Sequence, residues 1–327
     1  MIGSAGSSTN TGRPHNSNPV SGTHRRFVAP SESIIRRVLE KTDAAALDLA
    51  VGAWLFARAT RDDDGDLVIA LDGKVLRGAW TGENQQVTLF SAMFHREGVV
   101  VAQTQVPDGT NEITQVENLL ENIAITPGQT IVTLDAAHTQ RETALYLQKR
   151  GIDYLMNVKG NQPTLHAKVF SRCLPLLQED PGNVVEERSH GRIIRWTTWT
   201  TTADGIDFPN AATVAVIRRE EFDLAGRRVT KEYAFIITSL HGRHASAETI
   251  HTHVCQHWGI ENRVRYVRDT TWREDANQTY SGNGPRTLAV LRNLALSLFR
   301  LHGITKVKET TEFIARDRNR ALTLLAT

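Results

Sequence analysis

Two aspartates that end apolar runs are the first candidates for chemistry in this chain. Asp72 follows residues 67–71 and Asp135 follows residues 130–134, and both runs read as strands buried on two faces. Ligands of α/β sheets bind at the carboxyl ends of the strands. Two neighbouring carboxylates at such an edge repel one another unless cations lie between them, which favours a paired divalent-metal site. For either aspartate alone, a turn or helix-cap role is the alternative.

A third acid, Glu261, lies in the stretch His257-Trp258-Gly259-Ile260-Glu261-Asn262. If the segment is a helix, Glu261, Arg265 and Arg268 recur at i, i+4 and i+7 and share one face. The carboxylate suits a hard cation and the guanidinium groups suit phosphates, although a solvated face with i,i+4 charge pairs is the alternative. Together with the two aspartates, Glu261 would hold two Mg²⁺ ions, or Mn²⁺ in their place, about 3.5–4 Å apart.

Composition is that of an ordinary globular protein, with 40% hydrophobic and 23% charged residues among 327. The net charge of +2 divides into +4 over residues 1–41, −7 over 42–256 and +5 over 257–320. Basic ends around an acidic middle suit a polyanion such as nucleic acid. We expect no membrane segment or secretory signal, and two widely spaced cysteines favour a reduced, cytoplasmic protein.

The order of predicted elements indicates an α/β fold. Three strand-like runs (67–71, 86–95 and 98–106) are followed by a helix, a strand, a helix and a strand that ends at residue 158. With aspartates after the first and fourth strands, this is the order of a ribonuclease-H-like mixed sheet flanked by helices. Residues 183–240 alternate as further strands, and helices return after them.

These patterns predict six segments. They are a disordered tail at 1–29, an N-terminal helical remnant at 30–66, the first part of a ribonuclease-H-like catalytic core at 67–182, a β-rich insertion at 183–240, the second part of the core with the glutamate helix at 241–305, and a C-terminal tail at 306–327. The acid Glu261 would thus reach the first part of the core across the insertion.

Several separate motifs resemble those of bacterial insertion-sequence DDE transposases, in the H-repeat-associated (ISAs-type) branch of the IS4-like class. The motifs are Ile69-Ala70-Leu71-Asp72-Gly73-Lys74, Thr133-Leu134-Asp135-Ala136, Asn157-Val158-Lys159-Gly160-Asn161-Gln162, His190-Gly191-Arg192, His257-Trp258-Gly259-Ile260-Glu261-Asn262 and Arg273-Glu274-Asp275-Ala276. They occur in the family order between about residues 28 and 299. Members usually carry an additional N-terminal region, which we expect this chain to lack.

The resemblance implies that Asp72, Asp135 and Glu261 are the catalytic and metal-binding triad. It implies magnesium-dependent cleavage and transfer of DNA strands at insertion-sequence ends. The partners would be double-stranded DNA, as terminal inverted repeats and target, and a second copy of the chain in a synaptic dimer at the nucleoid. Our candidate DNA contacts are Lys74, Arg77, Lys159, Asn161, Gln162, Arg192, Arg265 and Arg268.

Two rival hypotheses stay open at this point. The chain is a shortened, inactive remnant that binds DNA as a repressor, or it is a ribonuclease-H-like nuclease unrelated to transposition. Among the acids, Asp269, Glu274 and Asp275 are weaker candidates for the third position because they lie beyond the predicted helix face. The tryptophan Trp258 would stack on a splayed base or, more commonly, pack in the core.

Overall fold

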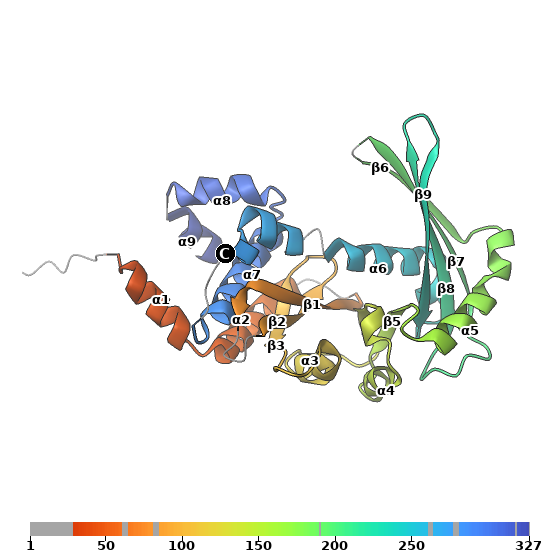
Figure 1. The fold of residues 1–327 in the computed structure, drawn as a ribbon, viewed down its shortest axis with the longest axis horizontal. Helices are drawn as coiled ribbons and strands as arrows, with labels where there is room; N and C mark the ends of the chain where they lie inside the picture. The colour runs from red at the N-terminus through yellow and green to blue at the C-terminus, as the bar shows by residue number, and fades with distance from the viewer. Residues whose placement is uncertain are drawn as a thin grey trace, which may run out of the picture.

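The structure is a computed structural model and describes residues 29–60, 65–80, 85–189, 191–260, 264–276, 281–317 and 319–326. Within these ranges one mixed sheet runs through the molecule in the order β3-β2-β1-β4-β5-β9-β8-β7-β6 (Figure 1). Its strands are β1 (Leu67–Trp80), β2 (Gln86–Phe94), β3 (Val100–Gln105), β4 (Thr130–Leu134), β5 (Asp153–Val158), β6 (Asn183–Ser189), β7 (Arg192–Thr202), β8 (Thr213–Asp223) and β9 (Arg228–Thr238).

The first five strands have the topology that the sequence predicts. Strands β1, β2 and β3 form an antiparallel meander, and β4 and β5 run parallel to β1. The register pairs Ala70 with Thr133, so Asp72 and Asp135 lie at the same level of neighbouring parallel strands. This arrangement is that of a ribonuclease-H-like sheet, and the predicted fold class is confirmed.

The β-rich segment continues the same sheet. Strand β9 pairs antiparallel with β5, from Leu155 opposite Thr238 to Val158 opposite Phe235. The alternating stretch at 184–202 is two strands, β6 and β7, and Gly191 between them has a φ of +75°, which allows a tight turn. Strands β6 to β9 form the right-hand end of the molecule in Figure 1.

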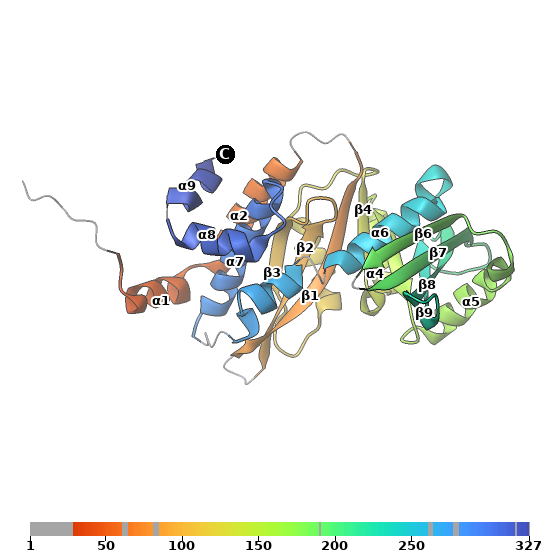
Figure 2. The same ribbon diagram turned by 90° about the horizontal axis from the view of Figure 1, so that it is seen from above.

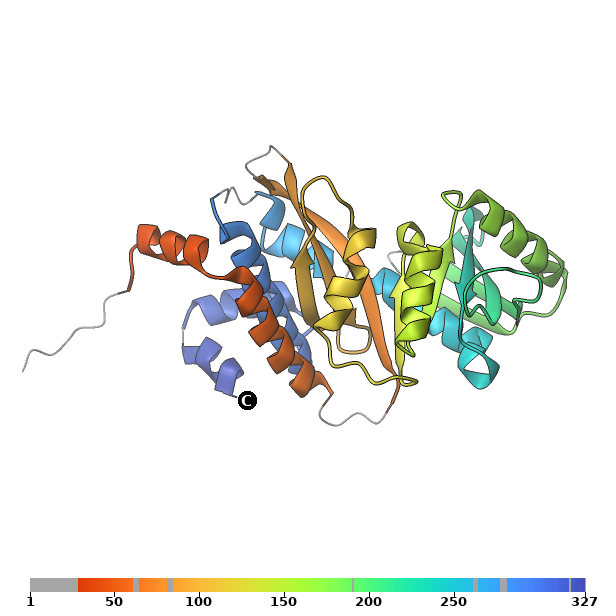
Figure 3. The ribbon, with the colours of Figure 1, turned by 90° about the horizontal axis from the view of Figure 1, so that it is seen from below.

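Helices cover both faces of the sheet. Their bounds are α1 (Glu32–Lys41), α2 (Ala44–Ala59), α3 (Val116–Glu121), α4 (Arg141–Lys149), α5 (Pro163–Cys173), α6 (Ala247–Ile260), α7 (Gly284–Leu301), α8 (Val307–Ala315) and α9 (Asn319–Ala326). One face packs against α2 to α5, which lie in front of the sheet in Figure 3, and the other against α6 and α7, which Figure 2 shows from above. Short helical turns complete the described connections: η1 (Glu112–Gln115), η2 (Ala136–His138), η3 (Pro175–Gln178), η4 (Gly242–Ala245), η6 (Val267–Thr271) and η7 (Glu274–Ala276).

Alternation along β1 assigns its side chains to the two faces. Ile69 and Leu71 pack with α2 to α5, whereas Ala70 packs with the end of α6 and with α7. Asp72, two residues after Ala70, therefore belongs to the α6–α7 face, and Gly73 belongs to the α2–α5 face. Helix α2 packs directly on the sheet, since a Cβ at Gly52 would lie 2.2 Å from the carbonyl oxygen of Val101.

Two expectations about helices change. Helix α6 is described as far as Ile260 and residues 261–263 lie outside the described residues, but Val267–Thr271 is a π-helical turn, so Arg265 and Arg268 do not have the spacing of the expected α-helix. The expected C-terminal tail is helical, as α8 and α9, because Val307 is buried beside Phe299 and Trp272 donates a hydrogen bond to Thr311. In the described ranges no helix is both long and apolar enough to cross a membrane.

Candidate active site at the end of strand β4

Asp72 lies inside β1 rather than at its end. The strand continues to Trp80 because its other neighbour, β2, pairs with it beyond residue 72. The apolar run stops at Leu71 because β4 ends at Leu134, which leaves β1 without a partner on that side. Asp72 therefore stands at the opening that begins where β4 ends, between β1 and β5.

Asp135 is the first residue after β4 and faces the same opening. Its carboxylate caps the turn η2 by accepting hydrogen bonds from the backbone N–H groups of Ala137 at 3.1 Å and His138 at 3.4 Å. About half of the side chain stays exposed. The capping bonds fix Asp135 in place while part of its carboxylate remains accessible to a ligand.

Glu261, the third predicted acid, lies outside the described residues, and its role stays a prediction. Arg265, four residues further along the chain, belongs to the described residues. Its Nη2 donates to the Asp72 carboxylate and to the carbonyl oxygen of Gly73. The guanidinium thus occupies the position beside Asp72 at which a cation is needed. Burial raises the pKa of Asp72, Arg265 opposes this effect, and the carboxylates of Glu112 and Asp135 add to it.

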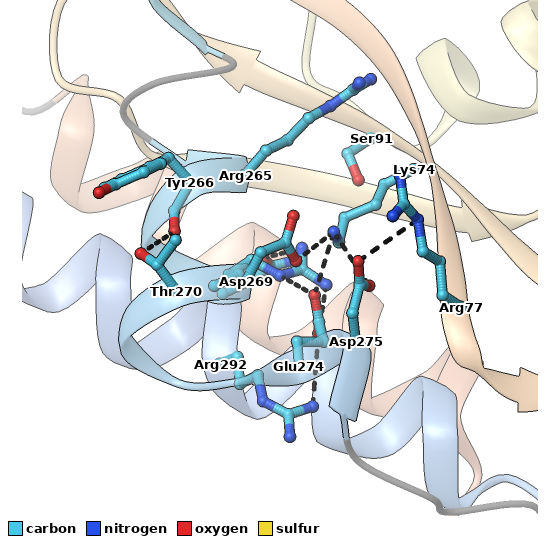
Figure 4. A network of polar contacts seen from close by, with 12 residues as sticks. Lys74, Arg77, Ser91, Arg265, Tyr266, Asp269, Thr270, Glu274, Asp275 and Arg292 are labelled. Carbon is cyan, nitrogen blue, oxygen red and sulfur yellow. Dashed lines mark hydrogen bonds and ion pairs between the residues drawn. The ribbon is translucent and has the colours of Figure 1, made fainter.

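Arg268 does not share the position of Arg265. Its side chain is 3% exposed, and its guanidinium forms two 2.7 Å bonds to Glu274 and a 2.8 Å bond to Asn293. Figure 4 shows Arg265 pointing away from this group. Because Arg268 is buried and three of its five N–H groups are bound to Glu274 and Asn293, it is not available to a phosphate and is not among our proposed DNA contacts.

Lys74 belongs to the same network, which we call the ion-pair cluster. Its Nζ lies 2.5 Å from Asp269, 3.6 Å from Asp275 and 3.9 Å from Glu274 (Figure 4). The cluster consists of Lys74, Arg268, Arg292, Asp269, Glu274 and Asp275. The three acids that we weighed as substitutes for Glu261 are thus bound by cations here, and Lys74 also lacks a free position for DNA.

Two histidines and a threonine connect α6 to the sheet behind Asp135. The hydroxyl of Thr133 lies 2.7 Å from Nε2 of His95 and 2.8 Å from Nδ1 of His257, so it donates to one ring and accepts from the other. Burial lowers the pKa of His257 to about 4, against the opposing effect of Asp135, and the ring is neutral at pH 7. The motif residue His257 therefore fixes the helix that leads to Glu261.

The sequence reasoning missed Glu112 and His138. Glu112 begins η1, and a Cβ added to Gly73 would lie 1.7 Å from its Oε1. His138 is 1% exposed, with Nε2 at 3.6 Å from Glu112 and 3.9 Å from Asp135. Only His138 offered a signal, three residues after Asp135; Glu112 directly precedes a segment predicted as a helix, and no pattern there indicates a contact with β1.

The predicted DNA contacts on the loop after β5 divide into two kinds. Asn161 donates to the carbonyl of Ala136 at 2.7 Å and Gln162 donates to Gln140 at 2.8 Å, so both stabilise the turn that carries Asp135. Lys159, at the start of this loop, is exposed.

Two further predicted DNA contacts lie on strands, Arg77 on β1 and Arg192 on β7. Arg77 is 79% exposed and lies beside Asp275, and Arg192 is 57% exposed and lies beside Glu221.

A cavity of about 830 Å³ adjoins the loop after β5, between α6 and strands β7 to β9. Lys159, Arg219 and Trp258 are among its lining residues. Trp258 also packs against Trp196, with ring centroids 5.3 Å apart, so it contributes to the core and to the cavity wall. The cavity brings cationic and aromatic side chains together, with the acids Glu187 and Glu232 also in its lining.

The described residues fit a hard cation by donor type and charge. Asp72, Asp135 and Glu112 offer oxygen ligands, which Mg²⁺ prefers, and only one guanidinium, that of Arg265, compensates Asp72. In the parts of the chain that the structure describes, no three His, Cys, Asp or Glu side chains are already arranged to hold a metal ion. The site would therefore need Glu261 or a rearranged carboxylate to complete a ligand set.

The fold and this site define a class of protein. The family described as the transposase DDE domain matches residues 63–298, and the chain belongs to this family. Members of the family typically act with divalent metal ions.

Particular relatives agree with this assignment. The "H repeat-associated putative transposase YhhI" of Escherichia coli (strain K12) is 28% identical over 313 residues, which cover 91% of this chain and 81% of that protein. The "putative transposase YncI" of Escherichia coli O157:H7 is 26% identical over 286 residues, covering 83% and 71%. The predicted family is confirmed.

Among solved structures, a piggyBac transposase synaptic complex with hairpin DNA is similar with a TM-score of 0.41 and 9% identity. The similarity covers 86% of this chain and 56% of that one.

Proposed function

We propose that this protein cleaves and joins DNA strands at the ends of an insertion sequence in a metal-dependent reaction. The observation that carries the proposal is the pair of carboxylates, Asp72 and Asp135, at one level of neighbouring parallel strands where β4 ends. Membership of the DDE transposase family supports the same reaction class.

The chain's own residues would hold the cations and the DNA. Asp72, Asp135 and Glu261 are the proposed ligands of two Mg²⁺ ions, which, when bound, would activate the attacking hydroxyl and stabilise the leaving oxygen. Arg265 would exchange its contact with Asp72 for a phosphate when a cation arrives. Asn161 and Gln162 hold the Asp135 turn, and we propose Arg77, Lys159 and Arg192 as phosphate contacts.

The proposed substrate also sets the proposed partners. Terminal inverted repeats and target DNA would bind along the exposed cationic residues, and a second copy of the chain would join two ends in a synaptic dimer. With DNA as the substrate, the proposed location is the nucleoid in the cytoplasm.

The test is a pair of substitutions with two measurements. Glu261→Gln and Asp72→Asn should each abolish metal-dependent cleavage of an end-containing DNA, a loss on the order of 10³-fold or more, while DNA affinity in a gel-shift assay survives. Cleavage retained by Glu261→Gln would remove that residue from the site. If the unmodified chain binds DNA and never cuts it with Mg²⁺ or Mn²⁺, the inactive repressor is the better account.

A further inference from the structure

We propose that Glu112 is a fourth acidic residue of this site, which faces the divalent cation beside Asp72 and Asp135, and that His138 is its positioning residue. The inference rests on the metal-dependent function proposed above, because it names a further carboxylate toward the same cation.

The position of Glu112 depends on a glycine. A Cβ on Gly73 would lie 1.7 Å from Oε1 and 2.2 Å from Oε2 of Glu112, so the carboxylate fills the space of a side chain at position 73. Neighbouring residues of a strand face opposite sides of the sheet. Glu112 therefore approaches β1 on the α2–α5 face, directly beside Asp72 on the α6–α7 face.

Strand β4 ends at Leu134, so no residue of β4 lies beside β1 from Asp72 onward. Beyond Leu134 no strand separates β1 from the turn that carries Asp135. Asp135 occupies this opening, and Nε2 of His138 lies 3.9 Å from its carboxylate and 3.6 Å from that of Glu112. Three carboxylates from three segments thus repel one another around one opening, and a bound cation would relieve this repulsion.

His138 is a second and independent observation. Its ring is 1% exposed and stacks on Phe90 at 4.9 Å, and its Nδ1 is buried without a hydrogen-bond partner among the described atoms. Its Nε2 points at Glu112 and Asp135 from 3.6 and 3.9 Å, beyond ordinary hydrogen-bond length. A buried ring whose Nε2 faces two carboxylates is explained when it supports them as they turn toward a ligand.

Mn²⁺ alone is the probe, with bound and free ion measured by electron paramagnetic resonance on the full chain. Glu112→Gln should weaken Mn²⁺ binding on the order of tenfold or more. Glu117→Gln, an exposed carboxylate on α3, is the matched control and should bind as the unmodified chain does. Glu112→Gln with unchanged Mn²⁺ affinity would overturn the inference.

The role of His138 has its own readout. His138→Gln should weaken Mn²⁺ binding in the unmodified chain but add nothing in the Glu112→Gln background, because it acts through that carboxylate. Fully additive losses would show that His138 does not position Glu112. Circular dichroism of each variant confirms that it is folded.

A further variant separates this inference from the proposed function. If Asp72→Asn loses Mn²⁺ and Glu112→Gln does not, only the role of Glu112 fails. If both bind as the unmodified chain does, the metal site of the proposed function fails with it.

Discussion

Two groups of charged side chains lie next to each other along β1, one at Asp72 and one at Lys74. In the ion-pair cluster, three cations face three acids, and Glu274, which is 2% exposed, is bound by two arginines. At the Asp72 site, three acids share one described guanidinium, that of Arg265. Both groups belong to the same fold, but only the second has unbalanced charge.

The difference indicates which group is structural and which binds a ligand. A buried ion pair is tolerated when partners satisfy every charge, as Asn293 completes the bonding of Arg268. Acids held together without enough cations destabilise the fold, and such clusters persist where a ligand completes them. Neither a buried charge nor a single uncompensated acid therefore marks an active site; several acids that share too few cations around one opening do.

The largest expected effect comes from breaking the balanced group. Arg268→Met leaves Glu274 buried with Arg292 at 3.3 Å and Lys74 at 3.9 Å, and should cost about 3–5 kcal/mol of unfolding free energy in urea denaturation. Arg77→Met is the control, because this arginine is 79% exposed and should change stability by less than about 0.5 kcal/mol. A loss below about 1 kcal/mol for Arg268→Met would mean that the cluster is not structural.

Asp48 is a buried acid that has few compensating partners and belongs to no proposed ligand site, so it sharpens the comparison. It lies on α2, is 8% exposed, accepts one hydrogen bond from the N–H of Gln103 at 2.8 Å, and burial raises its pKa to about 6. Its folded-state pKa exceeds the ordinary value of 3.8, so stability is lost as the pH rises from about 4 through 6.

Asp48→Asn should therefore stabilise the protein at pH 7 by up to about 3 kcal/mol, a gain that disappears below pH 4. Thermal unfolding across this pH range measures it, with the exposed Asp180→Asn as control. A gain that is independent of pH would show that the carboxylate charge of Asp48 is not its cause.

Much of the fold was predictable because strand periodicity is a local property. The apolar runs before Asp72 and Asp135 predicted two neighbouring buried strands, and the structure pairs these strands in parallel. The pairing of β9 with β5 was not predictable, since alternation in a strand does not name its partner.

The candidate site was predictable only in part, because contacts between distant segments are not a local property of the sequence. Motif residues identified Asp72 and Asp135, whereas Glu112 reaches β1 only because residue 73 has no side chain. The helix pattern also misled for Arg268, because a π-helical turn changes the face on which a residue lies. Tertiary contacts decided each of these cases.

The smallest expected effect tests the unbalanced group directly. Burial and the neighbouring acids raise the pKa of Asp72 despite Arg265, so its ionised form destabilises the metal-free fold at neutral pH. In the presence of a chelator, Asp72→Asn should unfold at a higher temperature than the unmodified chain, by less than Asp48→Asn. Added Mn²⁺ should raise the unfolding temperature of the unmodified chain but not that of Asp72→Asn, because a ligand stabilises only the state that binds it. With Mn²⁺ the unmodified chain should then be the more stable of the two. If Asp72→Asn is the less stable protein under chelation, the Arg265–Asp72 pair is a net stabilising ion pair, and the contrast with the ion-pair cluster fails.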